Sequence, residues 1–360
     1  MVDPKNICIV RLSAIGDAIH TLPLINGLRR GFPKARLTWV VQPIPHQLVR
    51  HQKAVDEFVV FDPRAGLGEW WRLFAELREK KFDLVLVPQI SAKAWIVSKL
   101  ISSPRRLGFD FSRSRDFHWL MTSHHLPRRA RQHVQDEQLE FLEAFGIPPD
   151  PVEWDLVVTD EEKIRSREFF SRFGRPVAAL VVATSRIEKD WTAEGYARVI
   201  ESLDRDFGIQ PLLVGGPSEK ERRIVEAICS IARVEPAVAL DGPLRDTLWK
   251  LWGADLVISP DTGPLHAAMA LGKPVIGLYG YSDPRRCGPY RRCGDLLVNK
   301  FADGGDPGPI TRTNRPGRMA AIRPDEVLDK ISIAVGGYLR NPLDGLPVRA
   351  GSDAVSAASQ

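Results

Sequence analysis

The amino-acid sequence predicts an α/β protein built from two doubly wound parallel sheets. Short β-branched runs alternate with segments whose apolar residues recur at helical spacing, which is typical of parallel sheets covered by helices. This alternation occurs twice, on either side of the proline-rich stretch 147–151, and 360 residues exceed the usual size of one core. We therefore expect domains at 1–150 and 151–340, with a flexible tail at 341–360.

The first domain begins its alternation at the amino terminus. The expected strands are 6–11, 37–41, 58–61 and 84–87, and the expected helices are 18–28, 70–80, 91–101 and 132–145. Gly146 should end the last of these helices, because glycine readily adopts the backbone conformation that follows a helix.

The second domain repeats this architecture without repeating the sequence. A helix is expected at 161–173, strands at 177–182, 211–214, 237–240, 256–258 and 274–278, and a last helix from Arg323 to the glycines Gly336 and Gly337. Residues 303–318 are dense in Gly, Pro and Arg and are expected to form a mobile loop. Two such domains should leave a cleft onto which the carboxyl ends of both sheets open.

Composition and charge restrict the functional classes. The chain is 44% hydrophobic and 26% charged, as soluble globular proteins are, and no apolar run approaches the roughly 20 residues of a membrane span. The first 150 residues carry a net charge of +6 and the remainder −1. Seven arginines between Arg105 and Arg131 face only two aspartates, which indicates an acidic partner or a solvated surface. Nucleic acid is not expected, because no interleaved aromatic residues mark a recognisable module.

Cysteine usage and the amino terminus indicate a cytoplasmic protein. Four scattered cysteines are too few for a disulfide framework, and the spacing of Cys287 and Cys293 does not suit a zinc site. The amino terminus lacks the basic segment and long apolar stretch of a secretory signal. We therefore expect reduced thiols and no bound metal.

Residues 259–266, Ser-Pro-Asp-Thr-Gly-Pro-Leu-His, carry the strongest local signal. They lie between an apolar run and a helical pattern and therefore predict a strand, a tight turn and a helix start. Asp261 or Thr262 can cap that helix and leave its first N–H groups exposed, which favours an anion. A plain strand-to-helix cap explains these eight residues equally well.

Two further loops of the second domain suit phosphate. After the strand 177–182, Thr184 and Ser185 can donate from neutral hydroxyls and Lys189 supplies a positive charge. After the strand 211–214, Gly215 and Gly216 allow a ligand to approach the backbone closely. With the helix start at Thr262, these loops predict a phosphate cradle.

Asp17 is the candidate general base. It stands at the start of the helix after the first strand, where an acidic residue often only stabilises the helix end. On a loop that faces the cleft, the same carboxylate could take a proton from an acceptor hydroxyl.

Other nucleotide-binding signatures are absent. Neither GxxxxGK[ST] nor GxGxxG occurs, which argues against a P-loop nucleotidase and a standard dinucleotide enzyme. Asp204 and Asp206 match the aspartate pair of metal-dependent sugar transferases only formally, because they lie at a predicted helix end. We therefore expect no metal and no cofactor, and assign Lys189 and a helix dipole to a departing diphosphate.

Taken together, the loops resemble the ADP-heptose:lipopolysaccharide heptosyltransferases, which form glycosyltransferase family 9. The resemblance spans most of residues 5–335 and is most specific at 11–23, 184–191, 259–266 and 272–280. Residues 184–191 resemble the heptosyltransferase I branch. The resemblance implies a GT-B fold, with an acceptor-binding Rossmann-like domain at 1–150 and a nucleotide-sugar-binding one at 151–340.

The resemblance also implies a reaction and a set of residues. The family transfers L-glycero-D-manno-heptose from its ADP-sugar to a Kdo residue of the lipid A inner core, with inversion and without a metal. Asp17 would be the base and Lys189 would stabilise the leaving group. The implied donor-binding residues are Thr184, Ser185, Lys189, Gly215, Gly216, Asp261, Thr262, Gly263 and His266. The implied acceptor-binding residues are Ser13, Gly16, Arg105, Arg106, Arg128 and Arg131.

Several points stay open at the level of sequence. Residues 281–294, with four arginines, and the long stretch 303–318 fit no motif of the family. Another nucleotide sugar, another anionic glycan acceptor or a non-catalytic glycan-binding role would suit the same architecture. We expect a monomer and allow for peripheral contact with the cytoplasmic face of the inner membrane.

Overall fold

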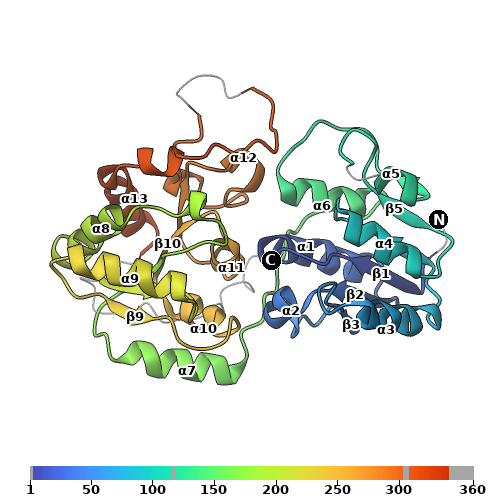
Figure 1. Ribbon diagram of the computed structural model, residues 1–360, viewed down its shortest axis with the longest axis horizontal. Coiled ribbons are helices and arrows are strands. Elements are labelled where there is room, and N and C mark those ends of the chain that lie inside the picture. The colour runs from blue at the N-terminus through green and yellow to red at the C-terminus, as the bar shows by residue number, and fades with distance from the viewer. Residues whose placement is uncertain (1–2, 115–117, 303–307, 340–360) are drawn as a thin grey trace, which may run out of the picture. The chain divides into compact units, whose positions relative to one another are not determined.

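The chain folds into two compact units. The computed structural model describes residues 3–114, 118–302 and 308–339 (Figure 1). The first unit consists mainly of residues up to Val157, and the second mainly of residues from Val158 onward. Each contains a six-stranded sheet whose neighbouring strands all run parallel, which confirms the predicted fold class. The segment expected to be a tail lies outside the described residues.

The first sheet has the strand order β3-β2-β1-β4-β5-β6. Its strands are β1 (Asn6–Val10), β2 (Arg36–Val41), β3 (Glu57–Val60), β4 (Leu84–Leu86), β5 (Arg106–Gly108) and β6 (His124–His125). The helices of this unit are α1 (Ile15–Gly31), α2 (Pro43–Val49), α3 (Leu67–Arg78), α4 (Ala92–Leu100), α5 (His118–Met121) and α6 (Val134–Glu143). The sequence did not predict α2, α5, β5 or β6, because all four are too short to show a clear period.

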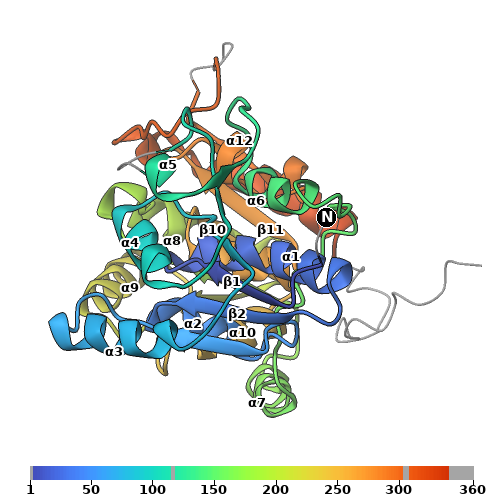
Figure 2. The same ribbon diagram turned by 90° about the vertical axis from the view of Figure 1, so that its right-hand side faces the viewer.

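Helices α3, α4 and α5 lie in a row along one side of the first unit (Figures 1 and 2). Alternate residues of β1, including Cys8 and Val10, share a buried cluster with Leu73 of α3 and Val97 of α4. Strand β1 is β-branched and fully covered on this face, as a central parallel strand should be. The packing therefore holds α3 and α4 firmly against the sheet.

The second sheet has the strand order β12-β11-β10-β7-β8-β9. Its strands are β7 (Val177–Val181), β8 (Gln210–Val214), β9 (Ala237–Ala239), β10 (Leu256–Pro260), β11 (Val275–Tyr279) and β12 (Val298–Asn299). The α-helices of the second half of the chain are α7 (Asp160–Ser171), α8 (Ala193–Arg205), α9 (Glu219–Ile231), α10 (Asp246–Gly253), α11 (Gly263–Ala270), α12 (Pro284–Cys287) and α13 (Pro324–Gly337). Three single 3₁₀ turns, η1 (Ile187–Lys189), η2 (Gly294–Leu296) and η3 (Arg318–Ala321), complete this half.

Two expectations concern the end of the second half. Helix α13 ends at Gly337, as the two glycines predicted, and the N–H of the following Tyr338 donates to the carbonyl of Ala334. Residues 303–307 of the expected mobile loop lie outside the described residues, and the loop ends at η3. Among the described helices, none is long and apolar enough to cross a membrane.

A topological switch point lies at the middle of each sheet. In the second sheet β7 and β10 are neighbours, yet the chain continues from β7 to β8 on one side and from β10 to β11 on the other. Loops that leave in opposite directions open a crevice at the carboxyl ends of the two strands, where ligands of open α/β sheets bind. Strands β1 and β4 hold the same place in the first sheet. The segments after β1, β7 and β10 carry Asp17, Lys189 and Asp261, whereas Gly215 and Gly216 follow β8 and the predicted arginines lie around β5 and β6.

Candidate functional site

Asp261 is the centre of a polar cluster at the switch point of the second sheet. It follows β10, and its Oδ2 accepts a hydrogen bond from Lys189 Nζ at 2.6 Å. Lys189 belongs to η1, in the loop after β7, and also donates to the Asp261 carbonyl at 3.2 Å. His266 Nε2, one helical turn into α11, lies 3.4 Å from Asp261 Oδ1. The structure thus brings together three residues that the sequence had assigned to the donor site.

The surroundings of Asp261 favour its ionised form. Burial opposes ionisation of this carboxyl group, but the hydrogen bond from His266 and the positive charge of Lys189 outweigh it and lower the pKa well below its usual range. The Asp261 side chain is 10% exposed and that of Lys189 is 21% exposed. The pair is therefore a largely desolvated ion pair that a ligand can still reach from the lysine side.

The start of α11 differs from the predicted cap. Thr262 occupies the N-cap position, but its side chain makes no capping hydrogen bond, and Asp261 is turned toward Lys189 instead. Among the described residues, none accepts the backbone N–H of Thr262 or Gly263. Two N–H groups at the positive end of a helix dipole therefore remain available to an anion beside the Lys189 ammonium.

Thr184 stabilises its own loop. Its hydroxyl donates to the Arg186 carbonyl at 2.6 Å and lies 3.0 Å from Asp190 Oδ1, which also accepts the Thr184 N–H. The predicted hydroxyl donor for phosphate is thus engaged within the loop, while Ser185 is exposed beside it. Lys220 donates to the Thr184 carbonyl and pairs with Asp190 at 2.5 Å. The sequence analysis missed Lys220, because its neighbours in the sequence are charged helix residues without a motif.

The glycines after β8 face a carboxylate. Gly216 donates its N–H to Glu221 Oε1 at 2.7 Å, and a side chain at Gly215 would collide with Glu221 and Leu240. Glu221 lies in the first turn of α9, where its N–H donates to the Ser218 side chain that begins the helix. The side chain that approaches these glycines closely is therefore that of Glu221. The sequence analysis missed this residue as well.

Ser282 completes the cluster around Asp261. Its hydroxyl donates to Asp261 Oδ2 at 2.6 Å from the loop after β11, and the residue is buried. The neighbouring Tyr281 ring lies 5.8 Å from Lys189 Nζ. Both residues belong to the stretch 281–294, for which the sequence analysis found no motif, so part of that stretch contacts the polar cluster around Asp261.

Asp17 lies in the first unit, at the third position of α1. Its Oδ2 accepts the Ala14 N–H at 3.0 Å, as an N-terminal helix acid does, and its Oδ1 pairs with Arg11 NH2 at 2.6 Å. The Asp17 side chain is 40% exposed, whereas that of Arg11 is 9% exposed. Each carboxylate oxygen can accept a further hydrogen bond. The helix-end role and an accessible, oriented carboxylate therefore coexist.

The loop between β1 and α1 is held by the loop after β4. Gln89 accepts the Leu12 N–H at 2.6 Å and lies 3.4 Å from the Ser13 nitrogen. Ser13 and Gly16 are half-buried on either side of Ala14, next to Asp17. These two predicted acceptor residues thus lie within four residues of Asp17 in the sequence.

Some arginines of the predicted patch are bound within the protein, and others are exposed to a ligand. The Arg106 guanidinium donates to the carbonyls of Ser98, Ile101 and Ser103 around the end of α4, and burial lowers its pKa. Arg113 is buried and pairs with Asp110 and Glu140. Neither guanidinium is therefore available to a ligand.

The remaining arginines border a hollow of the first unit. The hollow measures about 470 Å³ and is lined by Ser112, Arg113, Arg128, Arg129, Ala130 and Arg131. Arg129 pairs with Glu143 at 2.8 Å, whereas Arg128 is exposed and has no partner among the described residues. Arg105 is exposed at the start of β5 and does not line this hollow. An anion would meet Arg128 first.

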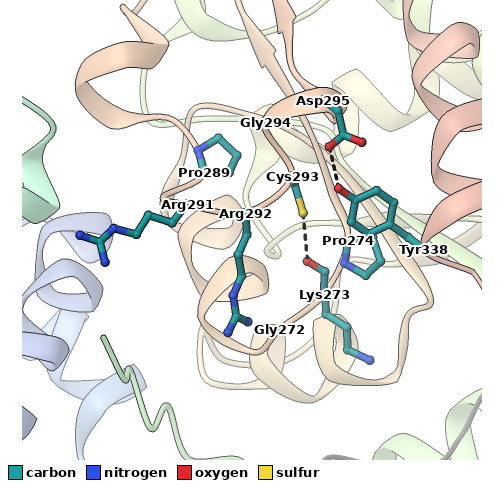
Figure 3. Close-up of a pocket in the computed structure, with 10 residues that line it drawn as sticks. All are labelled: Gly272, Lys273, Pro274, Pro289, Arg291, Arg292, Cys293, Gly294, Asp295 and Tyr338. Carbon is teal, nitrogen blue, oxygen red and sulfur yellow. Dashed lines mark hydrogen bonds between the residues drawn. The ribbon is translucent and has the colours of Figure 1, made fainter. Parts of the chain in front are cut away.

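Figure 3 shows a larger hollow in the second unit. It measures about 700 Å³ and is lined by residues 272–274, 289 and 291–295 and by Tyr338. Residues 272–274 precede β11, so this hollow opens at the amino-terminal edge of the sheet. Arg291 and Arg292 point in different directions, and Tyr338 donates to Asp295, which raises the pKa of Tyr338 to about 12. None of the predicted donor residues lines it.

Metal ligands are not grouped in the described part of the chain. Within residues 3–114, 118–302 and 308–339, no three His, Cys, Asp or Glu residues are arranged to hold an ion. Asp204 instead pairs with Arg175 at the end of α8. Lys189 and the start of α11 place positive groups at the switch point.

The comparisons with known sequences all indicate one protein family. Residues 70–301 match the model of glycosyltransferase family 9 (heptosyltransferase). The lipopolysaccharide core heptosyltransferase OpsX of Haemophilus influenzae is 31% identical over 295 residues, which cover 82% of this chain and 84% of that protein. Lipopolysaccharide heptosyltransferase 1 of Escherichia coli K12 is 27% identical, with 79% and 90% covered.

Solved structures share the fold. A family 9 glycosyltransferase from Veillonella parvula superposes with a TM-score of 0.78 at 22% identity, covering 92% of this chain and 98% of that one. The E. coli heptosyltransferase WaaC with ADP superposes with a TM-score of 0.71 at 22% identity, covering 91% and 99%. At this level of identity the likeness concerns the architecture of the two units.

Proposed function

We propose a specific reaction for this chain, which belongs to glycosyltransferase family 9, the heptosyltransferases: transfer of a heptose from ADP-L-glycero-D-manno-heptose to Kdo in the inner core of lipopolysaccharide. Relatives whose structures were solved with ADP and with an ADP-heptose analogue support the proposed donor. A relative named for the lipopolysaccharide core supports the proposed acceptor class. The observation that carries the proposal is the cluster of Lys189 and Asp261 at the switch point of the second sheet.

Asp17 acts as the general base in the proposed mechanism. The acceptor hydroxyl oxygen attacks the anomeric carbon as its bond to the diphosphate oxygen breaks, and Asp17 takes the hydroxyl proton. Attack opposite to the leaving group inverts the configuration at that carbon. The ion pair with Arg11 supports this role, because it holds the carboxylate in one orientation while leaving it 40% exposed.

Lys189 and the start of α11 stabilise the leaving ADP. Negative charge grows on the diphosphate as the glycosidic bond breaks, and fixed positive groups lower the energy of that state. The Lys189 ammonium and the N–H groups of Thr262 and Gly263 are suited to this task. These groups supply the positive charge that a metal ion provides in other transferases, so we propose a metal-independent reaction. Asp261, held by Ser282, would accept hydrogen bonds from sugar hydroxyls.

Acceptor binding is assigned to the first unit. The hollow that includes Arg128 and Arg131 offers guanidinium groups, which bind carboxylates and phosphates in a planar, two-pronged geometry. Ser13 and Gly16 lie next to Asp17 and would border the reacting hydroxyl. An acceptor rich in carboxylates and phosphates therefore suits the charge of this unit.

The direct test is a coupled assay for ADP. Purified protein should release ADP from ADP-heptose only when a Kdo-lipid A acceptor is present, and the product should gain one heptose by mass spectrometry. Equal ADP release without acceptor would show hydrolysis in place of transfer.

The second candidate is a transferase for another nucleotide sugar, because the fold and a diphosphate cradle do not define the sugar. A panel of nucleotide sugars in a thermal-shift assay distinguishes the two. A ligand at 100 times its Kd should stabilise the protein by about 2.7 kcal/mol. Stabilisation by a different nucleotide sugar, with none by ADP-heptose, would replace the proposed donor.

A further inference from the structure

The first unit exposes a stripe of large apolar side chains that its core does not use. Leu67, Trp71 and Phe74 follow one another at helical spacing along α3, and Leu67 and Trp71 are 81% and 70% exposed. The buried residues of the same helix, Leu73 and Leu77, point into the core cluster instead. Helix α3 therefore has two apolar faces, of which one packs against the sheet and the other meets solvent.

A shallow apolar groove runs between this stripe and α4. It measures about 300 Å³ and is lined by Leu67, Trp70, Trp71, Phe74 and Leu100. No charged residue lines it. Contiguous exposed apolar surface of this kind, rimmed by polar residues, marks an interaction site in soluble proteins.

The apolar surface continues past α4 to the other end of the row of helices. Helix α4 packs against both α3 and α5, and the three lie side by side in two perpendicular views (Figures 1 and 2). Trp119 of α5 forms an edge-to-face pair with Phe111, which is 70% exposed. Among the described residues, every Trp and Phe with a largely exposed side chain belongs to this side of the first unit. Trp and Phe are residues that favour the interface of a lipid bilayer.

Positive charge accompanies the aromatic side chains. Residues 84–109, which include all of α4, contain four basic residues and no acidic residue. Arg106 is engaged by carbonyls, but Lys93, Lys99 and Arg105 are exposed and have no ion-pair partner among the described residues. Arg78 extends over the Phe74 ring at 5.6 Å. Basic residues interspersed with Trp and Phe are complementary to an anionic membrane surface.

We propose that α3, α4 and α5 form a membrane-docking face, whose occupant is the surface of a bilayer that contains anionic lipid. Leu67, Trp71 and Phe111 would insert at the level of the headgroups, while Lys93 and Lys99 contact lipid phosphates. Phe111 directly precedes Ser112 of the arginine-lined hollow, so docking brings that hollow to the lipid surface. The inference rests on the proposed function, because a lipid-linked acceptor presents its sugars at that surface.

Vesicle binding tests the docking face. Vesicles of phosphatidylethanolamine and phosphatidylglycerol should co-sediment the full-length protein, and vesicles of phosphatidylcholine alone should bind it less. The double variant Leu67→Ser/Trp71→Ser should bind at least about tenfold more weakly, because exposed apolar anchors dominate interfacial partitioning. Lys93→Glu should weaken binding to the anionic vesicles only. Both changes are on exposed positions, and circular dichroism melts should overlay that of the unaltered protein.

Matched controls come from the second unit. The double variant Ile164→Ser/Ile231→Ser removes two exposed apolar residues of α7 and α9, and Arg198→Glu reverses an exposed charge of α8. These controls should bind vesicles as the unaltered protein does. Equal vesicle binding by Leu67→Ser/Trp71→Ser and the unaltered protein would overturn the proposal, as would the absence of binding to anionic vesicles. A solution dimer that this variant converts to a monomer would also overturn it, in favour of a second copy of the chain as the occupant.

A water-soluble acceptor separates this inference from the proposed function. With deacylated Kdo-lipid A, the docking variant should transfer heptose at the rate of the unaltered protein, whereas with acceptor embedded in vesicles it should be slower. Transfer reduced equally on both acceptors would place these residues in substrate binding and overturn the docking role. Vesicle binding lost in the variant, together with no heptose transfer by any form of the protein, would retain the docking face and reject the proposed function.

Discussion

At the scale of single residues, Asp261 is the centre of the proposed donor site. Its carboxylate accepts from Lys189 and Ser282 and lies beside His266, so partners from two loops and from helix α11 hold it. A charge buried in this way is tolerated only when it is paired and hydrogen-bonded. This pairing fixes the position of Lys189 but leaves part of its side chain exposed. A diphosphate could then bind the Lys189 ammonium group while Asp261 remains bound to it.

Replacement of Asp261 should change how stability depends on pH. A carboxyl group whose pKa is lower in the folded chain adds stability above its unfolded pKa of about 3.9, and that contribution is lost as the pH falls below it. The pKa of Asp261 is lowered, against the effect of burial, by His266 and Lys189. We therefore expect Asp261→Asn to be less stable than the unaltered protein at neutral pH, with a difference in Tm that narrows below about pH 4.

Thermal melts from neutral pH to about pH 3 measure this difference. Asp160→Asn is the control, because the Asp160 side chain is 94% exposed and should affect Tm little at any pH. If the difference in Tm between Asp261→Asn and the unaltered protein stayed constant across the acidic range, ionisation of Asp261 would not contribute to stability.

Asp17→Asn should separate catalysis from binding. Asparagine keeps an oxygen that can accept the Ala14 N–H, so the start of α1 should survive, but it cannot take a proton. Loss of a general base typically lowers kcat by about 10² to 10⁴. Donor affinity, measured by calorimetry, should stay within about twofold because the donor residues lie in the second unit. Turnover at the unaltered rate would remove the catalytic assignment.

At the scale of elements, the turn after β8 depends on two glycines that contact Glu221. Gly215→Ala would place a methyl group against the Glu221 carboxylate and Leu240, and overpacking of this kind costs about 1–3 kcal/mol. Urea unfolding should show that loss. Gly174→Ala is the matched control, since open space surrounds Gly174 and its change should stay within about 0.5 kcal/mol. Equal stability of both variants would mean that Glu221 moves aside freely.

Two arginines of the predicted patch should respond differently to glutamine. Arg106→Gln removes donors from the carbonyls at the end of α4, so it should lower the free energy of unfolding by about 1–3 kcal/mol without a change in KM for acceptor. Arg128→Gln should leave stability unchanged and raise that KM by about tenfold or more, because it removes a charged donor from the hollow. Steady-state kinetics and urea unfolding of both variants measure the contrast. The reverse pattern would exchange their roles.

At the scale of the whole molecule, the proposed function assigns one kind of substrate-binding chemistry to each unit. The first carries the basic hollow and Asp17, and the second carries Lys189, Asp261 and the start of α11. Asp17 follows β1, and Lys189 and Asp261 belong to the loops after β7 and β10, so these three residues stand at the switch points of their own sheets, whereas the basic hollow is formed by residues that follow β5 and β6. In the proposed function, the two switch points would therefore serve two different substrates.

Removal of divalent ions should leave turnover unchanged. In the proposed mechanism, Lys189 and the N–H groups of Thr262 and Gly263 would oppose the charge of the leaving diphosphate in place of a metal. We expect protein dialysed against EDTA to keep kcat within about twofold, a change that corresponds to less than 0.5 kcal/mol in the barrier. A loss of tenfold or more that magnesium reverses would show that a metal bridges the diphosphate.

The pattern of apolar residues in the sequence was sufficient to predict the longer strands and helices and the polar residues that follow them. Strands β1, β7 and β10 are continuous apolar runs, which is how a parallel strand buried on both faces must look. Lys189 and Asp261 were predicted as site residues because charged side chains in the loops after such buried strands indicate a functional role. Short elements such as β5 and β6 carry arginine and histidine at a sheet edge, and they have no period that a sequence can display.

Partnerships between distant residues were decided by the tertiary structure alone. Lys189 and Asp261 are 72 residues apart, and only the parallel pairing of β7 with β10 brings their loops together. Nothing near Ser282 or Glu221 in the sequence marks them, because each acts through a side chain that reaches a neighbouring strand end. Arg106 was assigned to a ligand for the converse reason, since a sequence displays the charge of a guanidinium but not the carbonyl groups that it contacts. Sequence determined which chemical groups this protein possesses, and the fold decided which of them meet, because contacts depend on distance in space and not along the chain.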